Sequence, residues 1–534
     1  MRTLYFLCLI LLLGLGMASG HAQDATPYFT VELEEISVLN APALHSSAVG
    51  QHNGLWVFVT GRTNGLHDLG VNSDAFPDEF ANGAVVVYDP MNDQRWTASL
   101  DGLADSLADP LRSTNSQFHQ AGTVLYVIGG YGTSTAAGEQ ITFDTLTAFD
   151  LPDLIAAVQN GTDLNPHLRQ TSDSQLAVTG GHLIEHNGRY HLVGGHRFDG
   201  RYLGGASQAY TEAIRSFTLT DDEMALTLSD FTELSDAENL HRRDGNVGPV
   251  VYPDGREAFA LYGGVFNAAT RPYRTPIYVD DGGLTAEAFE AQFGHYTAPL
   301  LSLYDADTEA MQTVFFGGMG QFFVEYPGTD SSHVAEDIFV PFIDDVSVLA
   351  RSSDGTLAEF VLDNVRMPGL LGTNAAYFPN PAVPTYDNGV VMLRELSGRT
   401  LVGHIHGGIE SDMPNAGLLG GNTWASDRIF AVWITPLVTP SLEDEQPVAF
   451  TVSTASPNPF RAQTRLTVTL AEAQPLSVDV FDLIGRRVAQ VHDGLLNAGR
   501  HTFTLDAQAW PSGIYVARVS GSSGSTTQRL ARLR

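Results

Sequence analysis

The 534-residue sequence contains no lysine and only one cysteine, and both shortages limit what the protein can be. All 28 basic residues are arginines, and they face 61 acidic residues, so the formal net charge is −33. Proteins bind nucleic acids and anionic membranes through Lys and Arg side chains. A surface as acidic as this one therefore repels both. We therefore expect no nucleic-acid partner. The bias fits plain solubility and adaptation to a saline habitat or a GC-rich genome equally well, and none of these indicates a function.

The single cysteine, Cys8, lies in an N-terminal segment that has the features of a secretory signal peptide. A basic start is followed by an apolar run, Leu4–Leu15, and then by small residues. The run is too short for a bilayer-spanning helix, so we expect a signal peptide over 1–22 and no transmembrane anchor. The mature chain then lacks cysteine, which excludes disulfides, thiolate metal sites and cysteine nucleophiles.

A short apolar strand that ends in a glycine pair recurs through the middle of the chain. The copies are Leu55–Gly61 (degenerate), Leu125–Gly130, His191–Gly195, Ala260–Gly264, Val314–Gly318 and Val402–Gly408. Each copy is followed by a partner strand rich in β-branched and aromatic residues, with Gly, Asn and Asp between strands. Helical periodicity is confined to short segments near 151–159 and 285–293. Units of about 65 residues cannot bury their own faces, and a ring of four-stranded sheets solves this with few open edges.

The first copy resembles a kelch repeat. It has the inner-strand His45, the strand that ends at Gly61, then Tyr88-Asp89-Pro90 and Trp96. The resemblance implies an all-β fold with a six-bladed kelch-like β-propeller over 28–440, although five or seven blades also fit the irregular spacing. The second glycine of each pair is expected to let a neighbouring blade approach. The early strand 28–33 is expected to close the ring by joining the last blade.

The C-terminal part differs in charge and pattern. A polar, Pro-flanked linker over 441–454 separates it from the rest. Residues 23–453 carry a net charge of about −38, whereas 454–534 carry about +4, which indicates two modules with different roles. Alternating strands near 464–470, 476–482, 500–505 and 514–519 predict a small Ig-like β-sandwich.

Four segments of this module occur in the order typical of a known sorting domain: SPNPF, VDVFDLIGRRV, Gly499-Arg500-His501 and SGIYVARV. Over 455–534 the chain resembles the type A C-terminal sorting domain of the type IX secretion system. The resemblance implies recognition by the type IX machinery of a Bacteroidetes-like bacterium, and a protein that is secreted or attached to the cell surface. An ordinary Ig-like accessory domain is the alternative.

Histidines recur near the predicted inner strands: His45, His119, His182, His241 and His295, with Asn374 in the sixth copy. Imidazoles that face one channel can bind a metal or move protons. Kelch repeats commonly carry a packed histidine there, however, so we predict no metal site and no cofactor.

Arginine is scarce in the acidic module, so arginines that converge would create a local anion site. The loop after Gly61 contains Arg62, Asn64 and His67, and the loop after the glycine pair of the third copy contains His196 and Arg197. The segment before the fourth inner strand contains Arg242 and Arg243. Arginine suits the carboxylate of an acidic sugar or a peptide, whereas simple salt bridges to Asp and Glu are the alternative. The predicted ligand-binding set is Arg62, Asn64, His67, His119, His182, His196, Arg197, Arg242, Arg243 and His295.

Several propeller activities are excluded. A copper radical oxidase needs a Tyr–Cys cross-link, which the mature chain cannot form because it lacks cysteine. A sialidase carries repeated Asp boxes, whereas this sequence has one near match, 351–357, which lacks the closing Trp. Kelch-type sialic-acid mutarotases stay open, and no nucleophile elbow, P-loop or dinucleotide motif is present. We predict an exported propeller that binds an extracellular glycan, peptide or protein. The alternative is a carbohydrate-active enzyme, mutarotase-like or other, that uses His and Arg at the channel mouth; no catalytic residue is assigned.

Overall fold

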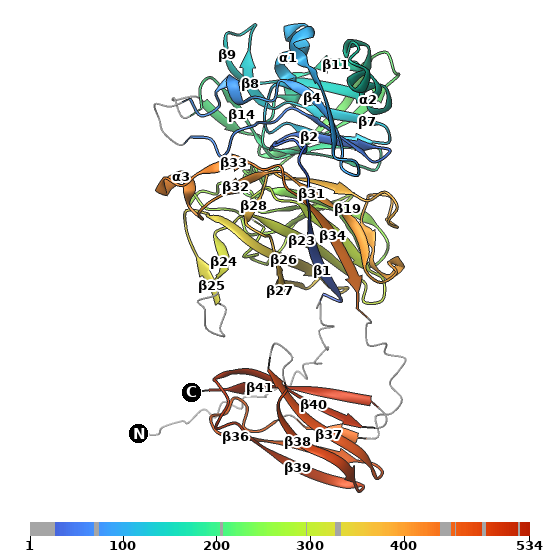
Figure 1. Ribbon diagram of the computed structural model, residues 1–534, viewed down its shortest axis with the longest axis vertical. Coiled ribbons are helices and arrows are strands. Elements are labelled where there is room, and N and C mark those ends of the chain that lie inside the picture. The colour runs from blue at the N-terminus through green and yellow to red at the C-terminus, as the bar shows by residue number, and fades with distance from the viewer. Residues whose placement is uncertain are drawn as a thin grey trace, which may run out of the picture. The chain divides into compact units, whose positions relative to one another are not determined.

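The computed structural model describes residues 27–68, 74–202, 207–294, 296–325, 333–437, 450–453, 455–482, 487–521 and 524–533. The expected signal peptide over 1–22 and most of the expected linker, 441–449 and 454, lie outside these ranges. The chain divides into two compact units, Met1–Val438 and Thr439–Arg534. Figure 1 shows both units.

Nearly all regular structure in the described ranges is β-strand, as predicted. The α-helices there are α1 (Asp105–Leu111), α2 (Leu151–Asn160) and α3 (Ala416–Leu419). The helical pattern near 151–159 therefore forms a helix. The one near 285–293 does not: β21 (Gly283–Ala286) enters it as a strand, and the rest is irregular.

Six mainly antiparallel sheets make up most of the larger unit, and we number them in chain order. The first sheet is β2 (Ala48–His52), β3 (Leu55–Val59), β4 (Ala84–Asp89) and β5 (Gln94–Ser99); the second is β6 (Gln117–Ala121), β7 (Val124–Ile128), β10 (Thr145–Asp150) and β11 (Leu168–Ser172); the third is β12 (His182–His186), β13 (Arg189–Val193), β16 (Ala213–Asp221) and β17 (Leu226–Ser235). The fourth is β18 (Asn246–Val251), β19 (Glu257–Tyr262), β20 (Ile277–Asp280) and β21; the fifth is β22 (Leu300–Asp305), β23 (Ala310–Met319), β26 (Phe342–Arg351) and β27 (Leu357–Arg366), with the parallel β30 (Val391–Met392) beside β22; the sixth is β29 (Ala376–Pro379), β31 (Thr400–His406), β34 (Ile429–Pro436) and β1 (Phe29–Ile36).

The loops that leave these sheets carry smaller sheets. They are β8 (Tyr131–Ser134), β9 (Glu139–Thr142), β14 (His196–Asp199) and β15 (Ser207–Tyr210); β24 (Phe322–Glu325) and β25 (His333–Glu336); and β28 (Leu370–Thr373), β32 (Ile409–Ser411) and β33 (Thr423–Ala425).

The first strand of the unit completes its last sheet. β1 pairs antiparallel with β34 along its whole length, from Phe29 opposite Pro436 to Ile36 opposite Ile429. Figure 1 shows the blue strand β1 lying beside the orange strand β34. The early strand therefore joins the last repeat, as predicted.

Apolar clusters lie between sheets that follow one another in the chain. Between the first two sheets, Val57 and Val87 pack with Leu125 and Phe149, and similar clusters join the later sheets. A further cluster joins the first sheet to the sixth, where Trp56 stacks on Phe378 with ring centroids 4.1 Å apart. The core therefore sits between the sheets, and the arrangement is propeller-like.

A chain of backbone hydrogen bonds links the segments that lead into the six sheets. The residues involved, which we call the ring residues, are Ser46, Asn115, Gly180, Asp244, Thr297 and Asn374. Five N–H···O bonds of 2.7–3.1 Å connect Ser46 to Asn374, Asn374 to Thr297, Thr297 to Asp244, Asp244 to Gly180 and Gly180 to Asn115. All except Thr297 have φ between 51° and 65°.

The glycine pairs bring neighbouring sheets together, but with the two positions reversed from the prediction. A Cβ on the first glycine would meet the next sheet's backbone: on Gly129 it would lie 2.1 Å from Val178 O. A Cβ on the second glycine, Gly130, would instead meet Ser113 and Ser116, which lead into its own sheet. The second glycine contributes its N–H, which Gly130 donates to Val178 O at 2.9 Å.

The smaller unit consists of two antiparallel sheets around one core. One contains β35 (Phe450–Val452), β36 (Gln463–Leu470) and β39 (Gly499–Asp506); the other contains β37 (Gln474–Asp482), β38 (Arg487–Leu496), β40 (Gly513–Gly521) and β41 (Gly524–Arg532). Alternate residues, among them Leu466 and Val468 on β36 and Val478 and Val480 on β37, form the shared core. The four strands expected here are all present.

Candidate functional site

Each of the six sheets contributes two neighbouring residues to one end of the larger unit. One residue directly precedes the ring residue, and the other directly follows the glycine pair. The backbone pairs are His45 with Arg62, Thr114 with Tyr131, Thr179 with His196, Arg243 with Val265, Tyr296 with Met319 and Thr373 with Ile409. All of these except Val265 line a cavity of about 430 Å³, which we call the mouth cavity.

Aromatic side chains from the loops form much of the mouth-cavity wall. They are Phe76, Phe198, Tyr202, Phe266 and Phe339, besides Tyr131 and Tyr296. Several contact one another: the ring centroids of Phe76 and Phe198 lie 5.3 and 4.9 Å from that of Tyr202. His67 packs between Phe76 and Tyr202, about 5 Å from each. Such walls suit apolar groups and the flat faces of sugar rings.

Arg62 is a buried cation in this wall, with only 4% of its surface exposed. Its Nε donates to Asn64 Oδ1 at 3.1 Å and its Nη2 donates to Pro77 O at 2.8 Å. Burial lowers the pKa of Arg62 to about 10, so the side chain stays charged at neutral pH. Within the described ranges it forms no ion pair; Asp74 and Asp78 act on it only at longer range. Within the described ranges, its hydrogen bonds to Asn64 and Pro77 use two of the five N–H donors of the guanidinium.

Arg243, the second cation of the wall, is neutralised by its neighbour. It forms an ion pair with Asp244, and its guanidinium lies 5.6 Å from the centre of the Phe266 ring. Burial lowers the pKa of Arg243, but the Asp244 carboxylate outweighs this and holds the pKa well above its usual value. Three arginines, Arg62, Arg243 and Arg271, and one aspartate, Asp244, line the mouth cavity, so its lining carries two net positive charges.

Three histidines of the mouth cavity are uncharged at neutral pH. Burial lowers the pKa of His45 to about 3, helped by the nearby Arg62 charge. Burial also lowers the pKa values of His67 and His196, and Arg243 adds to both effects. These imidazoles therefore offer hydrogen-bond donors and acceptors without adding positive charge to the cavity.

The structure gathers only part of the predicted residue set. Arg62, His67, His196 and Arg243 line the mouth cavity, and Asn64 orients Arg62. His295 lies outside the described residues.

His119 and His182 line a different space, a channel of about 780 Å³ among the inner strands. The ring residues Ser46, Asn115, Asp244 and Asn374 line both spaces, so the channel and the mouth cavity meet at the ring residues.

Arg197 and Arg242 do not line the mouth cavity. Arg197 is half exposed and pairs with Asp199 at 2.8 Å. Arg242 is 1% exposed and donates to the carbonyl oxygens of Asn239, Gly263 and Thr275, so it ties loops together.

The recurring histidines that the structure describes, His45, His119, His182 and His241, do not meet at one place, because they occupy different positions relative to the ring residues. His45 directly precedes its ring residue, whereas His119 and His182 follow theirs by four and two residues. His241 lies three residues before Asp244 and binds Glu212 at 2.6 Å. In the part of the chain that the structure describes, no three His, Asp or Glu side chains are grouped closely enough to hold a metal ion.

Sequence reasoning missed most of the wall. Besides the ring residues, the missed polar members are Thr114, Tyr131, Thr179, Tyr202, Thr270, Arg271, Tyr296 and Thr373. One signal was available: the residue directly after a glycine pair lines the mouth cavity in five of the six repeats. The aromatic residues from the loops had no such signal.

The comparisons with known proteins identify the smaller unit. Residues 455–531 match the family described as the secretion system C-terminal sorting domain. This confirms the predicted sorting domain and indicates export by type IX secretion to the cell surface or the extracellular space. Across the described residues, none of the helices is both long and apolar enough to cross a membrane.

Two solved structures that are similar to the chain are distant from it in sequence. No curated protein matches the chain. Among solved structures, that of YjhT is similar at 12% identity and a TM-score of 0.38, covering 73% of this chain and 95% of that chain. Dimeric latent PorU from Porphyromonas gingivalis is similar at 10% identity and a TM-score of 0.14, covering 57% of this chain and 36% of that chain. Likenesses this weak carry no argument about the fold or the function of the larger unit.

Proposed function

We propose that the larger unit is a closed, six-bladed, kelch-like β-propeller with the mouth cavity at one end of its central channel. Three observations support this. The five backbone bonds run through all six ring residues, β1 completes the last sheet, and the cluster around Trp56 and Phe378 packs the first sheet on the sixth. A closed ring leaves few sheet edges open for aggregation.

The function that this geometry supports best is the binding of an extracellular ligand through a carboxylate in the mouth cavity. The observation that carries the proposal is Arg62, a buried, charged side chain without an ion pair in the described ranges, where its hydrogen bonds use two of its five N–H donors. An arginine in this state gains charge-assisted bonds when a carboxylate arrives. The aromatic wall then holds the uncharged part of the ligand, and the neutral histidines, threonines and tyrosines bond its polar groups.

Charge limits which ligands fit. The lining of the mouth cavity carries two net positive charges, whereas residues 23–453 carry about −38. A ligand with a carboxylate and an otherwise neutral body is attracted by the cavity, and a polyanion is repelled by the surrounding surface.

A carbohydrate-active enzyme is the second candidate, because three neutral imidazoles line the same cavity as Arg62. Neutral histidines can accept and return protons, as interconversion of sugar anomers requires. The rate at which the anomers of a sugar acid interconvert, measured by proton NMR with and without the protein, distinguishes the two functions. Exchange accelerated by the protein and slowed by His67→Gln supports the enzyme, and unchanged exchange supports binding alone.

Purified protein tested on a glycan array and on a library of short peptides examines the proposed function. We expect the ligands that bind to carry a carboxylate and to lose binding to the Arg62→Gln variant. Arg256→Gln is the matched control, because Arg256 is an exposed, ion-paired arginine outside the mouth cavity. Ligands that bind Arg62→Gln as well as the wild type would overturn the proposal.

A further inference from the structure

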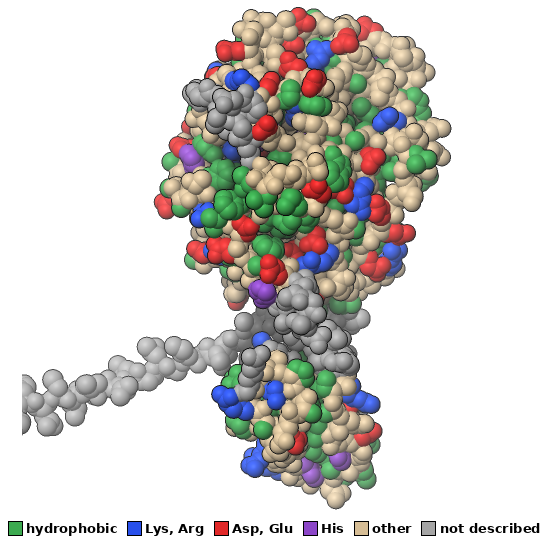
Figure 2. Space-filling model, turned by 60° about the vertical axis from the view of Figure 1, so that its left-hand side comes forward, with side chains coloured by type: hydrophobic (Ala, Val, Ile, Leu, Met, Phe, Trp, Pro, Cys, Tyr) green, Lys and Arg blue, Asp and Glu red, His purple; other side chains and the backbone are tan. Residues whose placement is uncertain are grey.

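Apolar side chains continue from the mouth cavity onto the surface beside it. Ile338 and Phe339 line the cavity, yet 45% and 61% of their surfaces are exposed. Leu418 and Leu419 on α3 are 51% and 68% exposed, and Trp424 on β33 is 41% exposed. We call these five residues the apolar rim. Figure 2 shows hydrophobic side chains gathered on one face of the larger unit. Exposed apolar patches of this kind mark interaction sites.

Hydrogen bonds tie the segments of the apolar rim to one another and to the cavity wall. Asn415 Nδ2, at the start of α3, donates to Asp337 Oδ2 at 2.9 Å, beside Ile338. Leu66, which lines the mouth cavity, donates its N–H to Thr423 Oγ1 at 2.8 Å, beside Trp424. The apolar rim therefore adjoins the wall of the mouth cavity.

Some buried polar atoms of the cavity wall form no hydrogen bond within the described residues. Among the described residues, His45 Nε2, Arg243 Nε and Thr373 Oγ1 have no hydrogen-bond partner, and Thr373 is only 2% exposed. Buried polar groups are nearly always satisfied, so three unsatisfied atoms in one wall favour a polar ligand in the mouth cavity. A hydroxyl and an N–H suit the amide and carbonyl groups of a peptide backbone.

We infer that the ligand is the carboxyl-terminal end of an extended peptide with apolar side chains. This inference rests on the proposed function. The terminal carboxylate binds Arg62, the last peptide groups bond the cavity wall, and the preceding side chains pack on the apolar rim. The terminal carboxylate is attracted by the net positive charge of the cavity lining, and capture of a chain end by its carboxylate is an established mode of peptide recognition.

The aliphatic character of the apolar rim favours a peptide over a sugar chain. Three of its five side chains, Ile338, Leu418 and Leu419, are branched aliphatic groups without a flat face. Sugar hydroxyls placed against them would lose water and gain no hydrogen bond, which costs free energy. Leucine, valine and phenylalanine side chains of a peptide gain from the same contact.

Isothermal titration of the full-length protein tests this with three probes: N-acetyl-Leu-Leu-Phe with a free carboxylate, the same peptide as its amide, and a uronic acid disaccharide. We expect the free acid to bind and the amide to bind at least about tenfold more weakly, because the charge-assisted bonds to Arg62 are lost. The double variant Leu418→Ser, Leu419→Ser should weaken the acid several-fold. Leu39→Ser is its matched control, because Leu39 is 91% exposed and lies outside the apolar rim.

The outcomes separate this inference from the proposed function. Binding of the disaccharide without binding of the peptide would overturn the inference and leave the proposed function standing. Equal affinity for the acid and the amide would overturn both. A change of oligomeric state in the Leu418→Ser, Leu419→Ser variant, with unchanged peptide affinity, would assign the apolar rim to self-association and overturn the inference.

Discussion

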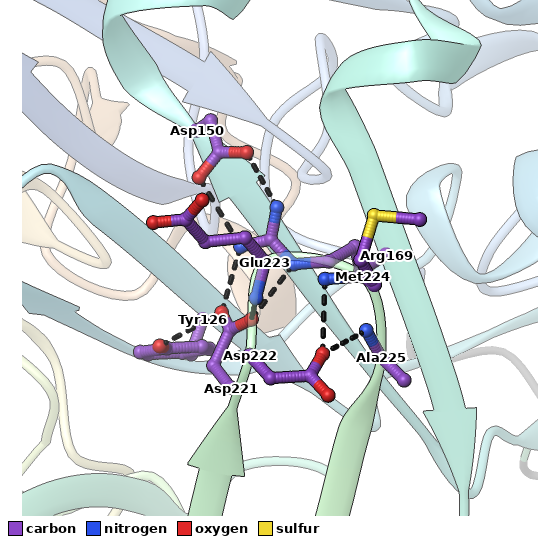
Figure 3. A network of polar contacts seen from close by, with 8 residues as sticks. All are labelled: Tyr126, Asp150, Arg169, Asp221, Asp222, Glu223, Met224 and Ala225. Atoms are coloured by element: carbon purple, nitrogen blue, oxygen red, sulfur yellow. Dashed lines mark hydrogen bonds and ion pairs between the residues drawn. The ribbon is translucent and has the colours of Figure 1, made fainter.

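Replacing Arg169 by methionine should destabilise the larger unit, because Arg169 joins two neighbouring sheets. Figure 3 shows the side chain of Arg169, on β11, between Asp150 at the end of β10 and Asp221 at the end of β16. Its Nη2 donates to Asp150 Oδ1 at 3.1 Å, and its Nε and Nη2 donate to Asp221 at 2.9 and 2.7 Å. Tyr126 adds its hydroxyl to Asp221 at 3.1 Å.

The burial of these groups sets the size of the effect. The side chains of Arg169 and Asp221 are 8% and 11% exposed, whereas that of Asp150 is 33% exposed. Removing one partner of a buried pair costs about 3–5 kcal/mol, because the other charge is left uncompensated. The bridge to Asp150 adds little, since water screens it. We therefore expect Arg169→Met to lower the free energy of unfolding by about 3 kcal/mol at pH 7.

The loss should depend on pH. Burial raises the pKa of Asp221, but the bonds from Arg169 and from the Glu223 N–H outweigh it and hold the pKa below its usual value. A depressed carboxyl pKa contributes stability above the unfolded-state pKa, near 3.9, and the contribution is lost as pH falls through the folded-state pKa. The difference between Arg169→Met and the wild type should therefore be full at pH 7 and shrink below about pH 4.

Urea unfolding followed by circular dichroism measures the effect. The variants Arg169→Met, Asp221→Asn and their combination form a double-mutant cycle, and Arg256→Gln is the exposed control. A loss below about 1 kcal/mol, the range of a surface pair, would refute the reasoning. So would additive effects of the two single substitutions, since the cycle would then contain no interaction between Arg169 and Asp221.

Three further predictions concern packing, acid stability and export. Gly129→Ala should cost about 2–5 kcal/mol in urea unfolding and Gly122→Ala only about 1–2, because both have φ near 60° but only Gly129 lies against a neighbouring backbone. His45 has a pKa of about 3 in the folded state, lowered from about 6.5 in the unfolded state, so the unfolded state binds more protons and the protein loses stability as the pH falls below 6.5. In the wild type this costs about 2 kcal/mol between pH 7 and pH 5, and the His45→Gln variant should not show that part of the loss. A chain that ends at Val438 should stay in the periplasm on cell fractionation, whereas the full chain reaches the outside, because 455–531 form the sorting domain.

Local patterns predicted the sheets because each strand carries its own signal. The apolar strand, the glycine pair and the partner strand are short-range features, and so is the alternation in the smaller unit. The segment 285–293 shows the limit. Its spacing of apolar residues is helical, but residues 283–286 pair with β20 instead, and Gln292 and Phe293 donate their N–H groups to Glu359.

The scarcity of arginine drew attention to Arg62 and Arg243, which line the mouth cavity, and equally to Arg197 and Arg242, which do not. On β14 successive side chains point to opposite faces, so His196 faces the mouth cavity and Arg197 faces solvent. Arg242 and Arg243 are also adjacent, and only Arg243 lines the cavity. A single step along an extended chain decides which neighbour reaches the site, and composition alone does not reveal it.

The aromatic wall could not be predicted, because its residues come from loops whose positions depend on the assembled sheets. Phe76, Tyr202 and Phe339 belong to three loops that are distant in the sequence and meet only at the mouth cavity. Loops carry binding residues for this reason: the sheets fix where they end, and the loop sequences are free to vary.

The most direct test of the account is the coupling between Arg62 and a ligand carboxylate. For any ligand that binds, the affinities of the free acid and of its amide should be measured for the wild type and for Arg62→Gln by titration calorimetry. The account predicts that the wild type prefers the acid by about 1.5 kcal/mol or more and that Arg62→Gln has no such preference. The same acid preference in both proteins would contradict it.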